Sequence, residues 1–139
     1  MMEKRKIEQI HPVLCHRIRQ QVMWPDQPLS FVQLDQDEEG IHHGYYTEDK
    51  LVGVLSWFFE DGKAQFRKFA VLPEFQSKGI GTELLTYGLD EMRRLSVKQV
   101  WCNARIEKSD FYTRFGLERT TERFQRKGKE YVIMRMNLT

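Results

Sequence analysis

The chain has 139 residues, of which 40% are hydrophobic and 30% are charged, and it carries a formal net charge of +2. This length fits a single domain over residues 1–139, and the mild charge predicts no nucleic-acid partner, which would require a basic face. The apolar stretch Leu51–Phe59 is too short to span a membrane, and two cysteines, Cys15 and Cys102, are typical of reduced thiols in a cytoplasmic protein.

The first predicted element is an amphipathic helix, because Leu14, Ile18 and Val22 recur at helical spacing. The segment Trp24–Pro28 ends this helix, since proline removes a backbone donor and restricts the residue before it. The polar run Asp35–Gly40 that follows is typical of a loop.

Three segments with a strand-like pattern come next, at Ile41–Thr47, Leu51–Phe59 and Lys63–Val71. Short turns separate them, which predicts an antiparallel meander. His42 and His43 are neighbours in the first of these segments, and neighbouring side chains of a strand point to opposite faces. The pair therefore cannot line one site, and the sequence predicts no metal.

Helices and strands alternate in the second half of the chain. The expected elements are a helix at Glu83–Leu95, a strand at Val97–Ala104, a short helix at Glu107–Phe115, and strands at Leu117–Phe124 and Tyr131–Leu138. Gly116 stands where a left-handed helix cap belongs. A strand–helix–strand step makes its two strands parallel, whereas hairpins make neighbours antiparallel. The sequence therefore predicts an α+β fold with a mixed, mostly antiparallel central sheet flanked by helices.

The segment Gln76–Thr82, with the sequence QSKGIGT, lies between a predicted strand and a predicted helix. Such a turn can hold phosphate, because the first N–H groups of a helix lack partners and carry the positive end of the helix dipole. Gly79 and Gly81 would let the backbone approach the anion and adopt positive φ. The spacing excludes a Rossmann fingerprint, since Leu84 occupies the third glycine position, and a P-loop, since Gly81 is followed by Thr82 and Glu83.

The order of elements and several motifs resemble the GCN5-related N-acetyltransferase (GNAT) superfamily over most of the chain. The motifs are FAVLP at Phe69–Pro73, QSKGIGT at Gln76–Thr82, NAR at Asn103–Arg105 and FYTRFG at Phe111–Gly116. They are similar to the family's central strand, its coenzyme A loop, and the strand and helix after it. Lys108 and Leu117 depart from the family pattern, which usually has a small and an aromatic residue there. The resemblance implies two parallel strands that splay apart, around Phe69–Leu72 and Val100–Ala104.

The resemblance implies acetyl transfer from acetyl-coenzyme A to a primary amine, by direct attack within a ternary complex. The acceptor would be a small molecule or a peptide, bound by the segments Trp24–Gly40 and Thr120–Glu130, and no metal would take part. Pantetheine would pair with the splayed strand edge. The implied coenzyme-binding residues are Phe69, Ala70, Val71, Gln76, Ser77, Lys78, Gly79, Ile80, Gly81, Thr82 and Asn103. Tyr112 is the implied catalytic residue, as the acid that protonates the departing thiolate.

Several of these residues also have an ordinary structural interpretation. Lys78 is either an electrostatic partner of the phosphates or a solvated surface lysine, and Asn103 either binds the coenzyme or caps a turn. Tyr112 is either the acid or a core aromatic. The basic pairs Arg67–Lys68 and Arg126–Lys127 are typical of solvated surface, and no general base is assigned. For the function of the whole chain, the alternative is a non-catalytic acyl-coenzyme A-binding or partner-binding module on the same fold. The sequence leaves open whether the chain forms a homodimer.

Overall fold

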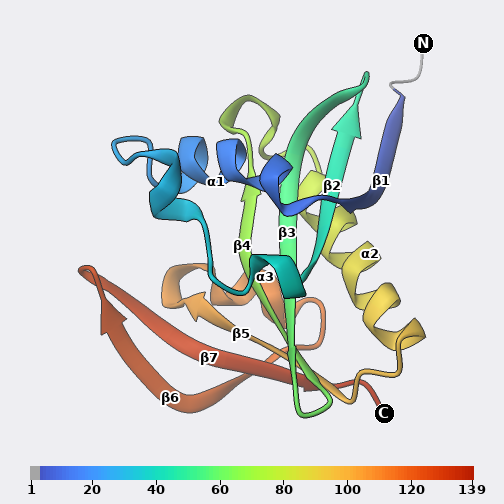
Figure 1. Cartoon of the computed structure of the whole chain (residues 1–139). Coiled ribbons are helices and arrows are strands. Elements are labelled where there is room, and N and C mark those ends of the chain that lie inside the picture. The colour runs from blue at the N-terminus through green and yellow to red at the C-terminus, as the bar shows by residue number, and fades with distance from the viewer. Residues whose placement is uncertain (1–3) are drawn as a thin grey trace.

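The computed structural model describes residues 4–139, which build one seven-stranded sheet with helices on both faces (Figure 1). The strand order is β1-β2-β3-β4-β5-β7-β6, and every neighbouring pair is antiparallel except β4 and β5. The strands are β1 (Arg5–Ile10), β2 (Ile41–Thr47), β3 (Lys50–Glu60), β4 (Lys63–Val71), β5 (Gln99–Arg105), β6 (Glu118–Arg126) and β7 (Lys129–Asn137). The predicted mixed, mostly antiparallel sheet is confirmed.

Three α-helices pack on the sheet: α1 (His16–Met23), α2 (Ile80–Arg94) and α3 (Ser109–Thr113). Arg19 of α1 bonds Ser56 of β3, whereas Gly88 of α2 packs on the next residue of β3, Trp57. Adjacent residues of a strand face opposite sides, so α1 and α2 cover different faces (Figure 1). Short 3-10 turns connect the elements at Pro12–Cys15, Leu29–Val32, Asp37–Glu39, Pro73–Phe75 and Ile106–Lys108. None of the helices described is long and apolar enough to cross a membrane.

The core between β3 and α2 is built around Trp57, whose side chain is fully buried. Gly88 permits this packing, because a Cβ at that position would lie 2.6 Å from the Trp57 ring. The buried side chains of α2 that complete this layer are Ile80, Leu84, Leu85, Leu89 and Met92. Burial of a large apolar side chain contributes roughly 1.5–3 kcal/mol, so this layer anchors α2 and the loop that precedes it.

Two elements at the start of the chain differ from those expected. β1 has no counterpart among the predicted strands, yet it pairs with β2 along its whole length. The predicted first helix begins as a 3-10 turn, so Leu14 is exposed and Cys15 is buried in its place, while Ile18 is buried as predicted and Arg19 is buried beside it. A 3-10 turn has about three residues per turn, which rotates Leu14 off the stripe predicted from α-helical spacing.

Candidate functional site

β4 and β5 are parallel neighbours only over their first residues. The pairs are Lys63 with Gln99, Ala64 with Val100 and Gln65 with Trp101. Beyond this point, β4 pairs with β3 alone, while β5 continues along β7 to its end. The two strands therefore diverge and leave facing edges without a partner strand. An extended chain that contains amides can hydrogen-bond to such an edge.

A β-bulge interrupts β4 in this diverging half. Ser56 and Val54 of β3 pair with Arg67 and Ala70, so the single β3 residue between them faces both Lys68 and its neighbour on β4. Lys68 has a left-handed backbone with φ of 55°. A bulge disrupts the ladder and redirects the strand, here where β5 has moved away. Nothing in the sequence marks this bulge, because no glycine occupies the left-handed position.

The predicted phosphate loop lies between β4 and α2. The side-chain amide of Gln76 donates to the carbonyl of Val71 over 2.9 Å, which ties the loop back to the end of β4. Ser77 and Gly79 have left-handed backbones, with φ of 62° and 83°. α2 begins at Ile80, so the N–H groups of its first turn lack helical acceptors. This arrangement favours an anion at the N-terminus of α2.

Gly81 does not adopt the positive φ expected for it. It lies inside the first turn of α2, because the helix starts earlier than predicted, and the left-handed positions are Ser77 and Gly79. A Cβ on Gly81 would meet the rings of Phe69 at 3.5 Å and Phe111 at 3.9 Å. Because Gly81 has no side chain, the space between its backbone and the aromatic rings of β4 and α3 stays open, and a ligand could approach the backbone closely there.

Other residues of the predicted coenzyme site differ in exposure. Ile80 and Ala70 are buried, so only their backbone groups can meet a ligand. Lys78 and Thr82 are exposed. The Lys78 Nζ lies 5.5 Å from the centre of the Phe75 ring, near the outer range of a cation–π contact, and the side chain stays accessible to solvent beside the loop.

Tyr112 lies in α3, with its ring centre 5.6 Å from that of Phe66 and 5.3 Å from that of Phe111. Burial, together with the nearby Cys102, raises the pKa of the Tyr112 hydroxyl above its usual range, so it stays protonated near neutral pH. Asn103 lies inside β5, where its backbone is paired with β7. It is not at a strand end, which argues against the turn-capping interpretation.

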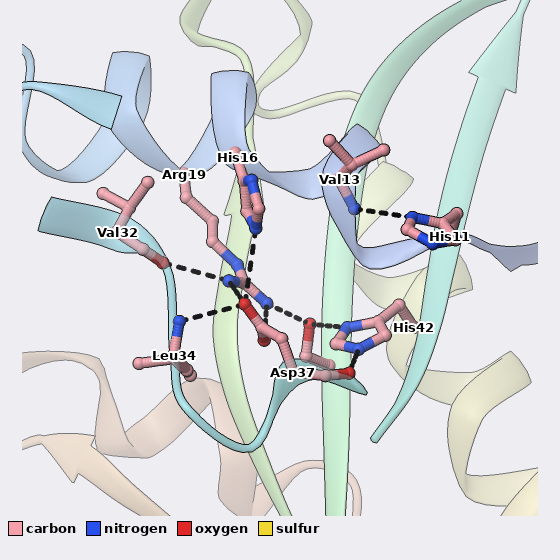
Figure 2. Close-up of polar contacts among 9 residues, drawn as sticks. His11, Val13, His16, Arg19, Val32, Leu34, Asp37 and His42 are labelled. Atoms are coloured by element: carbon pink, nitrogen blue, oxygen red, sulfur yellow. Dashed lines mark hydrogen bonds and ion pairs between the residues drawn. The ribbon is translucent and has the colours of Figure 1, made fainter. Parts of the chain in front are cut away.

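On the α1 face of the sheet, a buried ion pair holds the segment between α1 and β2 (Figure 2). Arg19 donates from Nη1 and Nη2 to the two carboxylate oxygens of Asp37, over 2.9 and 3.0 Å. The Arg19 guanidinium also donates to the Val32 carbonyl and the Ser56 hydroxyl, while the Leu34 amide donates to Asp37. This segment, one of the two expected to bind the acceptor, is thereby fixed to α1 and β3. The sequence offered no signal for this pair.

The tip of the β6–β7 hairpin reaches the same segment. The Lys127 Nζ lies 4.6 Å from the centre of the Trp24 ring and 4.2 Å from that of Phe31, and these two rings pack edge to face at 5.1 Å. The two segments expected to bind the acceptor therefore touch each other. A hollow of about 290 Å³ lies along the hairpin, lined by Ile106, Arg123, Phe124, Gln125, Glu130 and Tyr131.

The two neighbouring histidines lie on opposite faces. His42 bonds the Ser56 hydroxyl over 2.7 Å on the α1 face, whereas the ring of His43 packs against Tyr87 of α2 at 5.1 Å. The prediction that they cannot share a site is confirmed. Within residues 4–139, no group of His, Cys, Asp and Glu side chains is placed to hold a metal ion.

Comparison with known proteins agrees with this geometry. Residues 20–138 match a family model described as an acetyltransferase (GNAT) domain. The chain is 23% identical over 118 residues to the uncharacterized N-acetyltransferase YitI of Bacillus subtilis (strain 168), which covers 78% of this chain and 79% of that protein.

Crystal structures of acetyltransferases with a similar fold include two that cover nearly all of this chain. One, from Lactobacillus plantarum, has a TM-score of 0.87 at 17% identity and covers 97% of this chain and 99% of the other. The other is a GNAT family acetyltransferase from Elizabethkingia anophelis with acetyl-CoA bound, with a TM-score of 0.75 at 15% identity, covering 96% and 98%. The diverging strands β4 and β5 agree with the family match over residues 20–138. This match shows that the chain belongs to the GNAT acetyltransferases, N-acetyltransferases that take an acyl group from acetyl-coenzyme A.

Proposed function

We propose that this chain transfers an acetyl group from acetyl-coenzyme A to a primary amine of a small molecule or peptide, by direct attack within a ternary complex. The observation that carries the proposal is the divergence of β4 and β5 beside the N-terminus of α2. The strand edge suits the amides of pantetheine, and the helix N-terminus suits the pyrophosphate. The bonding groups would come from Phe69–Val71, Gln76–Thr82 and Asn103.

The chemistry at this site is an acyl transfer in two steps. The amine nitrogen attacks the thioester carbon, a C–N bond forms, and the carbonyl oxygen takes the negative charge. Backbone N–H groups at the β4 bulge, between Lys68 and Val71, would donate to this oxygen, as in other oxyanion holes. The C–S bond then breaks, the thiolate takes a proton from Tyr112, and the proton released by the amine passes through water to restore the Tyr112 hydroxyl.

Tyr112→Phe should lower kcat by about a hundredfold at most, with coenzyme binding little changed. A free thiol has a pKa of about 8.5, so the thiolate leaves readily, while burial raises the pKa of Tyr112 and makes it a weaker acid. Steady-state kinetics and calorimetric titration with coenzyme A measure the two effects. The control is Thr113→Ala, an exposed neighbour on α3. Wild-type turnover in Tyr112→Phe would assign Tyr112 to the core alone.

The proposed function is tested by release of free thiol from acetyl-coenzyme A. We expect release above an amine-free blank for at least one member of a panel of primary amines, and mass spectrometry should find the acetylated amine. Secondary and tertiary amines in the same panel test the preference for a primary one. Binding of acetyl-coenzyme A without thiol release across the panel would contradict the proposal.

We further propose that residues 1–139 act as one domain in the cytoplasm. Cys15 and Cys102 are both free and buried, a state that suits a reducing compartment. A homodimer stays a prediction, which sedimentation at several protein concentrations would test.

A further inference from the structure

Two basic pairs that are far apart in the sequence face the same space. Arg67 and Lys68 lie in the diverging half of β4, whereas Arg126 and Lys127 form the tip of the β6–β7 hairpin. The Arg67 guanidinium lies 6.0 Å from the ring centre of Phe58, which packs edge to face against His42 on the α1 face of the sheet. Lys127 lies over Trp24, the residue that caps the C-terminal end of α1. The hairpin tip and Arg67 are therefore on the α1 face, where the charge of Arg126 also acts on Arg67 and that of Lys127 on Lys68.

The position of the hairpin tip is set by aromatic contacts. Lys127 lies over Trp24 and Phe31, at 4.6 and 4.2 Å from the ring centres, and Arg126 lies 5.4 Å from the ring centre of Phe124. Cation–π contacts of this kind are worth about 0.5–1 kcal/mol at exposed sites. The two Lys127 contacts hold the hairpin against the segment Trp24–Gly40, whereas the Arg126 contact lies within the hairpin, and none of them neutralises its cation.

No carboxylate in the described part of the chain forms an ion pair with these four cations. Among residues 4–139, none of the ion pairs within 4.0 Å includes any of the four side chains. Asp37 is the acid whose charge acts on Arg67 and Lys68, but both of its oxygens already accept hydrogen bonds from Arg19. The cluster therefore keeps an uncompensated positive charge.

This uncompensated charge is costly because part of the cluster is removed from water. Arg67 and Lys68 are half-buried, so the interpretation of this pair as solvated surface is wrong. Burial, and then the charges of Arg67, Arg19 and Lys127, lower the pKa of Lys68 to about 8. Burial and Arg126 likewise lower the pKa of Arg67. Partly buried cations without an anionic partner are unfavourable, and an anion bound among them would relieve this cost.

We propose that the basic cluster of Arg67, Lys68, Arg126 and Lys127 binds an anionic group of the acceptor, a carboxylate or a phosphate carried near the amine that is acetylated. This inference rests on the proposed function and names the class of its acceptor. The planar fork of an arginine suits both anions, because it donates two parallel hydrogen bonds to them. The cluster borders the diverging half of β4, where the acetyl group is expected.

The same charges also suit the chemistry of the amine. Only the neutral amine can attack a thioester, and nearby cations disfavour the protonated ammonium form. An acceptor that is held through its anionic group would thus present its amine in the reactive form. An acceptor that lacks an anionic group would be deprotonated by the same cations, but it would not gain the binding contribution of the anion.

The test compares acceptors that differ in the anionic group. β-Alanine is paired with β-alaninamide, and O-phosphoethanolamine with ethanolamine, and kcat/KM is measured for each. A hydrogen bond to a charged group contributes enough to make the anionic member of a pair better by about ten- to hundredfold. Arg67→Gln and Arg126→Gln should each reduce this preference by about tenfold. Arg93→Gln, at the exposed C-terminal end of α2, is the matched control and should leave the preference unchanged.

The outcomes separate this inference from the proposed function. Equal kcat/KM within both pairs, or the same change in Arg93→Gln as in Arg67→Gln, would overturn the anion site while acetyl transfer stands. If no amine supports thiol release, calorimetric titration of the coenzyme A-saturated protein with β-alanine and O-phosphoethanolamine decides instead. Binding that Arg67→Gln weakens supports the site, and absence of binding overturns it. Whether the site prefers a carboxylate or a phosphate is shown by which of the two acceptors, β-alanine or O-phosphoethanolamine, has the larger gain in kcat/KM or the tighter binding.

Discussion

Gly81→Val is expected to weaken coenzyme A binding by at least about a hundredfold and leave the domain folded. A side chain that keeps the pyrophosphate from the first turn of α2 would remove hydrogen bonds to a charged group, each worth about 1.5–3 kcal/mol. A Cβ at Gly81 points at the rings of Phe69 and Phe111, at 3.5 and 3.9 Å. These are ordinary contacts for one methyl group, so the fold tolerates it. The two further methyl groups of valine would project into the space between the loop, β4 and α3, where we propose that the coenzyme binds.

Calorimetric titration with coenzyme A measures this effect, and circular dichroism shows that the variant is folded. Thr86→Val places the same side chain on an exposed position of α2 and should bind like the wild type. Gly81→Ala should lie between the two, because it adds the tolerated Cβ alone. If folded Gly81→Val binds coenzyme A as tightly as the wild type, the pyrophosphate does not sit at the start of α2.

Much of the fold could be predicted because it follows local patterns. The meander of β2, β3 and β4 shows in strand-like runs with short turns, and the opposite orientation of His42 and His43 follows from the two-residue period of a strand. β1 was missed because edge strands carry charged residues that protect them from aggregation. Lys6 and Glu8 there break the apolar alternation that signals a strand.

The placement of the segment Gln76–Thr82 between a strand and a helix was predictable from local patterns. These patterns predict a phosphate loop there, but they do not say where α2 begins. The helix starts at Ile80, whose side chain is buried at 2% exposure, so tertiary packing favours an earlier start than the local sequence indicates. Gly81 is consequently helical, and the positive φ expected at this glycine is found at Ser77 instead. Serine rarely adopts positive φ, so the sequence gives no sign of it.

The basic cluster could not be predicted from the sequence for a different reason. Arg67–Lys68 and Arg126–Lys127 each look like surface pairs in the sequence. The hairpin tip is placed on the α1 face by the contacts of Lys127 with Trp24 and Phe31. Contacts between residues so far apart in the chain depend on the tertiary arrangement of the strands, which local sequence patterns do not encode.

Asp37→Ala is expected to destabilise the fold by about 3–5 kcal/mol at pH 7, because removing one partner of a buried ion pair leaves the other charge uncompensated. Arg19 is fully buried and would lose both hydrogen bonds to Asp37. Urea unfolding followed by tryptophan fluorescence measures the loss. Asp90→Ala is the matched control: it removes an ion pair with Arg93 whose side chains are 69% and 48% exposed, and should cost less than about 1 kcal/mol.

The difference in unfolding free energy between the wild type and Asp37→Ala should also depend on pH. Burial opposes ionisation of Asp37, but the hydrogen bonds from Arg19 and Leu34 and the charge of Arg19 outweigh it and lower the pKa. The stabilisation is therefore complete above the unfolded pKa, about 4, and is lost as the pH falls through the lower folded pKa. His43, whose pKa burial lowers to about 4, destabilises both proteins between about pH 6.5 and 4 and cancels in the difference.

The Asp37 charge offsets part of the lowering of the His42 pKa by burial, so the difference in unfolding free energy should widen slightly as the pH falls below about 6.5. It should then narrow below about pH 4. Because Asp37 also fixes the segment that carries Trp24 and Phe31, its loss should release the hairpin tip held by Lys127. Faster hydrogen exchange at the amides of that segment would show this release. A loss no larger than that of Asp90→Ala, or a difference that stays constant through acid pH, would mean that packing and not the ion pair holds the acceptor segment in place.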